Sequence, residues 1–92
     1  MFDAQAISQV IGRKQYEAIN ASTLPREEAM TLLQIWTQRS PKRLRELAQA
    51  GDLLPILDGF SLGLEVARDT RLNNSHLTMV ECLQVAELPL AI

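Results

Sequence analysis

The residue types that most often carry chemistry are few and scattered in this chain. His76 is the only histidine and Cys82 the only cysteine, so they fall short of the four ligands of a structural zinc site. Cys82 lies in an apolar stretch with no basic neighbour in sequence, which favours a buried, inert thiol over a nucleophile. We therefore expect no metal site and no cofactor-binding site.

The carboxylates show no catalytic arrangement either. Glu27 and Glu28 are the only adjacent pair, and neighbours on a helix point in different directions. Their place at the start of a predicted helix indicates compensation of the helix macrodipole rather than a catalytic dyad. No phosphate-binding glycine loop, dinucleotide fingerprint or Ser-His-Asp spacing occurs. We expect a protein that is not an enzyme.

Basic residues concentrate in one short segment. Four of the nine fall within seven positions: Arg39, Lys42, Arg43 and Arg45. Such a cluster either contacts an anionic partner or forms a solvated face balanced by acidic residues elsewhere. Residues 25–55 also resemble a helix-turn-helix, although the first helix is about one turn too long. No β-wing follows, and a net charge of −2 is unusual for a DNA-binding domain.

Length and composition define the class of protein. The chain has 92 residues, of which 47% are apolar and 22% charged, as in ordinary globular domains. This length suits one domain, 1–92, with an aliphatic core because aromatic residues make up only 4%. The N-terminus lacks the basic and apolar regions of a signal peptide, and no apolar run approaches the roughly 20 residues of a membrane span. With a single cysteine, these features predict a cytoplasmic protein.

Helical periodicity predicts an all-α fold. Asp3 can cap the first helix, and Thr78 with Glu81 forms a predicted capping box. No alternating strand pattern or hairpin turn occurs. We expect a single bundle of about five helices in orthogonal or irregular packing. The helical segments are 3–11, 13–20 as a separate helix or a continuation, one from Pro25 to a break at Ser40-Pro41, 41–50, 52–71, and 78 to about 88.

The segment 52–71 is the longest apolar-periodic run and carries a stripe of small residues. Gly59, Gly63 and Ala67 recur at intervals of four, so they share one helix face. Each glycine costs about 1 kcal/mol relative to alanine, which close approach of another helix would offset. The stripe is either filled within the chain or left as a groove for a partner.

The last helix and the tail are unusually apolar. Only Glu81, Gln84 and Glu87 give the helix a polar strip, and such a helix is normally buried. We expect it to form a helical hairpin with 52–71 and to bury further surface in a homodimer or against a partner. The predicted function is a protein–protein interaction module, an adaptor, inhibitor or regulatory subunit; the alternative is a helix-turn-helix-like DNA-binding regulator using 41–50. The predicted partner-binding residues are Arg39, Lys42, Arg43, Arg45, Gly59, Gly63, Leu88, Leu90 and Ile92.

Overall fold

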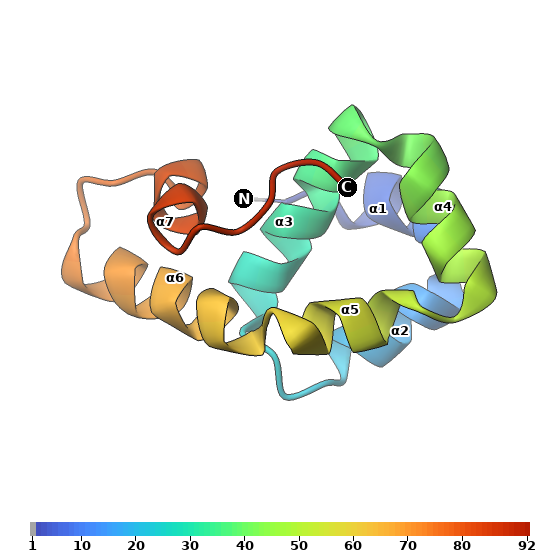
Figure 1. Ribbon diagram of the computed structural model, residues 1–92, viewed down its shortest axis with the longest axis horizontal. Helices are drawn as coiled ribbons and strands as arrows, with labels where there is room; N and C mark the ends of the chain where they lie inside the picture. The colour runs from blue at the N-terminus through green and yellow to red at the C-terminus, as the bar shows by residue number, and fades with distance from the viewer. Residues whose placement is uncertain (1) are drawn as a thin grey trace.

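The all-α prediction is confirmed. The computed structural model describes residues 2–92, and within them seven α-helices and no strand are present. Figure 1 shows α3 crossing the middle of the molecule, with α1, α2 and α4 towards one end and α6 with α7 at the other. The helices are α1 (Ala4–Ile11), α2 (Arg13–Asn20), α3 (Arg26–Arg39), α4 (Pro41–Ala50), α5 (Leu53–Gly59), α6 (Ser61–Asn73) and α7 (Met79–Val85).

The prediction of about five helices was too low, chiefly because segment 52–71 is two helices. The helix ends at Gly59, where the Phe60 N–H donates to the carbonyl of Leu57, three residues back, at 2.9 Å. Glycine makes this break inexpensive because it has the poorest helix propensity after proline. The break also lets the Phe60 ring meet Trp36 edge-on, with ring centroids 6.3 Å apart. Gly59 and Gly63 therefore lie on different helices.

The core is aliphatic and continuous from α1 to the C-terminal tail. Trp36 on α3 is fully buried and is the only aromatic residue among its most buried members. The predicted pairing of the last two helices is confirmed, since α6 packs more extensively against α7 than any other two helices do. The other fully buried large apolar side chains are Ile7, Met30, Leu32, Leu33, Leu44, Leu53, Leu57, Leu64 and Leu83.

The last helix begins as predicted and ends earlier. The Thr78–Glu81 capping box is present, with both reciprocal hydrogen bonds formed. The helix stops at Val85 rather than about Leu88 because Glu87 takes a left-handed conformation, with φ of 59°. The Leu88 N–H then donates to the carbonyl of Leu83 at 3.1 Å, which is the Schellman ending of a helix. This ending turns Leu88 back onto α6.

One partly buried ion pair connects α3 and α6. Glu28 is 1% exposed, and its Oε2 accepts a hydrogen bond from Arg71 Nε at 2.6 Å. This hydrogen bond to the Glu28 carboxylate raises the pKa of the Arg71 guanidinium above its ordinary value. Glu28 therefore has a structural partner that its position in the first turn of α3 did not predict.

Candidate functional site

The predicted basic cluster forms an exposed face on α4 and the end of α3. Leu44, Leu47 and Ala48 bury the inner side of α4, so its remaining positions turn to solvent. The four basic side chains of 39–45 are all exposed. We call Arg39, Lys42, Arg43 and Arg45 the basic face.

Among the residues that the structure describes, none of these four cations forms an ion pair. In residues 2–92, the ion pairs involve Arg13, Arg26, Arg68 and Arg71, and none involves the basic face. The net charge of the chain is −2. Because the basic face contributes +4 in total, the other residues carry a net charge of −6. The basic face is therefore a local positive region on an otherwise acidic protein, and it is free to meet an anion.

The two predicted partner-binding glycines lie in different surroundings. A methyl group placed on Gly63 would meet Leu88 Cδ2 at 2.8 Å and Leu88 Cγ at 3.3 Å. Gly63 is thus the seat of Leu88, which is only 6% exposed. A methyl group on Gly59 would meet nothing within 4 Å. The small-residue stripe is therefore filled from within the chain at Gly63 and open at Gly59.

The predicted apolar tail packs on the protein's own core. The Trp36 indole Nε1 donates to the carbonyl of Pro89 at 2.7 Å, and the Ile92 N–H donates to Ser40 Oγ at 3.2 Å. Ser40 stands at the N-cap position of α4, but its side chain makes no capping hydrogen bond. Leu90 and Ile92 are half-buried against the core. Figure 1 shows the tail running from α7 across to the end of α3.

The exposed large apolar side chains gather on one helical pair. Those recorded in the described residues all belong to α6 or α7, and Leu62 is the most exposed at 73%. The others are Val66, Leu72, Val80 and Val85. Figure 1 shows α6 and α7 at one end of the molecule and α4 at the other, so these exposed apolar side chains lie away from the basic face.

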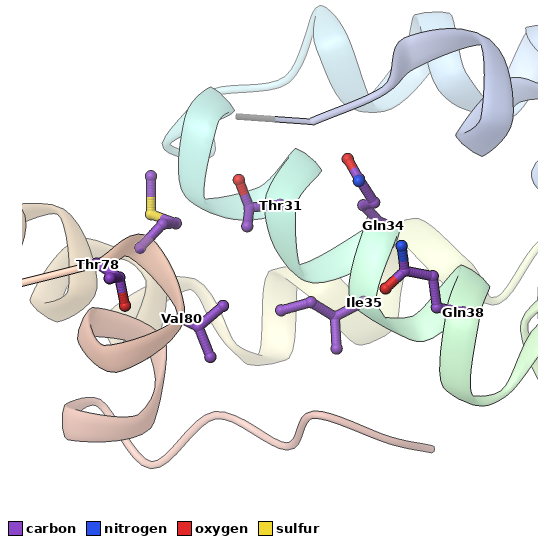
Figure 2. Close-up of a pocket in the computed structure, with 7 residues that line it drawn as sticks. Thr31, Gln34, Ile35, Gln38, Thr78 and Val80 are labelled. Atoms are coloured by element: carbon purple, nitrogen blue, oxygen red, sulfur yellow. The ribbon is translucent and has the colours of Figure 1, made fainter.

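A groove between α3 and α7 is the site that sequence reasoning missed. It has a volume of about 300 Å³ and carries no charged side chain among its lining residues. Figure 2 shows the α3 side chains in a row and Ile35 reaching towards Val80 across the groove. Its lining residues are Thr31, Gln34, Ile35, Gln38, Thr78, Met79 and Val80.

One residue that lines the groove, Thr31, has a buried hydroxyl without a hydrogen-bond partner among residues 2–92. Thr31 is 6% exposed, and its Oγ1 is the buried side-chain polar atom in residues 2–92 that has no hydrogen-bond partner. Buried polar atoms nearly always form a hydrogen bond, so an exception needs a physical explanation. The sequence signal was the polar spacing of Thr31, Gln34 and Gln38 at i, i+3 and i+7 beside the apolar residues in the middle of α3.

The residues with metal-binding or nucleophilic potential lie apart. His76 is exposed in the loop before α7, and Cys82 is buried. Across the described part of the chain, no three His, Cys, Asp or Glu side chains come close enough to hold a metal ion. No helix among residues 2–92 has the length and apolar character needed to cross a membrane.

Comparison of the chain with protein families, with curated proteins and with solved structures gives no significant match. The functional argument therefore depends on the geometry described above.

Proposed function

We propose that this protein is a non-enzymatic binding module that docks an acidic protein partner on the basic face. The observation that carries the proposal is the set of four exposed cations without an ion pair in residues 2–92. Unpaired charges on one face attract a partner of opposite charge and set its orientation.

The scaffold is suited to this role because α4 packs on three other helices. Leu44 and Leu47 are buried on its inner side, the helix contacts α1, α3 and α5, and Pro41 stands at its first position. Three arginines of the basic face offer planar guanidinium groups, which pair with carboxylates in a bidentate manner. Binding of this kind weakens as salt screens the charges.

The two lysines of the chain provide a matched test. Lys42 lies on the basic face and Lys14 lies on α2, and both are exposed and outside any ion pair in the described residues. In affinity capture from the native host followed by mass spectrometry, wild-type protein and K14E should retain the same acidic proteins. K42E should lose them, and raised salt should elute them. Equal retention by K42E would contradict the proposal.

The second candidate is the DNA-binding regulator. The same four cations favour it, because a basic helix exposed after a preceding helix is the arrangement that contacts phosphates. However, α3 and α4 are joined by the single residue Ser40, whereas the helix-turn-helix has a turn of about 3–4 residues. Retention of wild-type protein on duplex DNA at low salt, abolished in R43E/R45E, would favour this function. No retention would remove it.

We also propose that the protein self-associates through α6 and α7. The supporting observation is that the exposed large apolar side chains all lie on this pair, and such surface is typical of protein contacts. Sedimentation equilibrium at micromolar concentration should give twice the 10.3 kDa chain mass. Leu62→Glu should return the mass to that of one chain. A wild-type monomer would exclude this dimer.

A further inference from the structure

We propose that the acidic partner of the basic face is a second copy of this chain, which contacts α4 with the outer face of its α6. This inference rests on the proposed function, because it names the partner that the basic face binds. It also gives the proposed self-association through α6 and α7 a definite contact. We call Leu62, Glu65, Val66 and Asp69 the α6 face.

The four residues of the α6 face lie on one side of the helix. They stand at positions i, i+3, i+4 and i+7, which share a face of an α-helix. All four are exposed. Glu65 forms no ion pair among residues 2–92. Asp69 Oδ1 lies 3.9 Å from Arg68 Nε in an exposed pair, which holds it only weakly. The α6 face therefore combines apolar surface with two carboxylates that are available to cations.

The charges of the α6 face are spaced like those of α4. Glu65 and Asp69 lie about one turn apart on α6. Lys42 and Arg45 lie about one turn apart on α4. When α4 of one copy lies along α6 of the other, two ion pairs can therefore form side by side.

Each helix also carries one exposed charge of the opposite sign. Glu46 is the only carboxylate on α4, and it is exposed. Arg68 is exposed on α6, whereas Arg71 is held by Glu28 of α3. The charge pattern of each helix is thus the reverse of the other. A contact of α6 with α6 would instead bring the carboxylates of both copies together, and like charges at an interface are unfavourable.

The apolar part of the α6 face is also covered in this contact. Lysine and arginine pack their aliphatic stems on apolar surface and keep their charged ends in a polar environment. The stems of Lys42 and Arg45 can cover Leu62, which is 73% exposed in the single chain, while their charged ends reach the carboxylates. A charge at position 62 would face these stems and lose hydration without gaining a partner.

The shape of the molecule allows the contact to form twice. The molecule is 35 Å long and 23 Å wide, with α4 at one end and α6 at the other (Figure 1). Two copies that lie side by side in opposite directions place the basic face of each beside the α6 face of the other. This exchange of contacts is the two-fold arrangement of a closed dimer, so the expected mass is that of two chains.

Charge reversal tests the contact by sedimentation equilibrium at micromolar concentration. K42E/R45E and E65K/D69K should each raise the dissociation constant of the dimer about tenfold or more, because ion pairs become repulsive. K42E/R45E/E65K/D69K reverses both sides of each pair and keeps the wild-type net charge, so it should dimerise again. The control K14E/D58K reverses one exposed cation and one exposed carboxylate outside both faces, and it should dimerise like the wild type.

A mixture of the two double variants provides a second measurement, which does not need the four-fold variant to fold. In a 1:1 mixture of K42E/R45E with E65K/D69K, both contacts join opposite charges, so a dimer should form although each variant alone is monomeric. Far-UV circular dichroism checks that each variant keeps its helices. A K42E/R45E dimer as tight as the wild type would overturn the inference. So would a four-fold variant and a mixture that both stay monomeric.

Affinity capture with K42E separates failure of this inference from failure of the proposed function. If K42E loses acidic proteins other than this chain while charge reversal leaves the mass unchanged, the inference fails and the proposed function remains. If charge reversal acts as expected and no foreign protein is captured, the second copy is the partner of the basic face. If neither the mass nor the captured set responds to charge reversal, both fail.

Discussion

The close contact of Leu88 with Gly63 gives the most direct test of the packing between α6 and the segment after α7. In Gly63→Ala, the new methyl group would lie 2.8 Å from Leu88 Cδ2 and 3.3 Å from Leu88 Cγ, so the leucine must move. Overpacking of this kind costs about 1–3 kcal/mol. Alanine recovers about 1 kcal/mol of helix propensity, so we expect a net loss of about 0–2 kcal/mol in the free energy of unfolding.

Gly59→Ala is the matched control. It also replaces a helical glycine, but nothing lies within 4 Å of the new methyl group, and the backbone there has no positive φ. We expect a gain of about 0.4–1 kcal/mol. The two substitutions are chemically identical, so the difference between them measures the crowding at Leu88.

A double-mutant cycle assigns that crowding to one side chain. In Leu88→Ala, the atoms that meet the new methyl group are gone, so adding Gly63→Ala should be stabilising. We expect a coupling free energy of about 1–3 kcal/mol. Urea unfolding followed by the fluorescence of Trp36, the only tryptophan, measures all four proteins. Additive effects, or equal effects of Gly63→Ala and Gly59→Ala, would refute the seating of Leu88 on Gly63.

Three further predictions concern the ion pair and the two ends of α7. Arg71→Met leaves Glu28, 1% exposed, without its ion-pair partner, and should cost about 3 kcal/mol by urea unfolding; Glu28→Gln in the same chain should recover part of this loss. Hydrogen bonds from Thr78 lower the pKa of Glu81 below 4.5, so its contribution is present above about pH 4.5 and is lost as pH falls through the lowered value. Glu81→Gln, which does not titrate, should reduce that acid-dependent loss in thermal unfolding between pH 5 and pH 2, measured by circular dichroism. Glu87→Gly relieves a left-handed conformation and should stabilise by up to about 1 kcal/mol; an unchanged or lowered unfolding midpoint would contradict this.

Local signals in the sequence predicted much of the fold because they act over a few residues. Asp3 caps α1 through bonds to the Gln5 and Ala6 amides, and the Thr78–Glu81 capping box starts α7. The pairing of α6 with α7 followed from an apolar helix joined to its neighbour by a short loop. Each of these features is encoded by neighbouring residues, so spacing alone was enough to find it.

Features that depend on contacts between distant residues could not be predicted from the sequence. The break at Phe60 reflects its packing on Trp36, and the hydroxyl of Ser40 bonds Ile92 rather than capping α4. Likewise, the basic face could be placed from sequence, but the groove could not, because its second wall comes from α7. Periodicity shows that Thr31 is a polar residue among the apolar residues in the middle of α3, but it does not show which element lies opposite.

The bond from Trp36 to the Pro89 carbonyl has a consequence for synthesis of the protein. The two residues are 53 positions apart, so α1–α6 all leave the ribosome before this contact can form. Until then, the indole N–H has no carbonyl to bond and the Gly63 seat is empty. Closing so long a loop is also slow compared with forming a helix. A nascent chain therefore lacks the partner of the Trp36 indole N–H and the cover of Gly63 until the residues around Pro89 arrive.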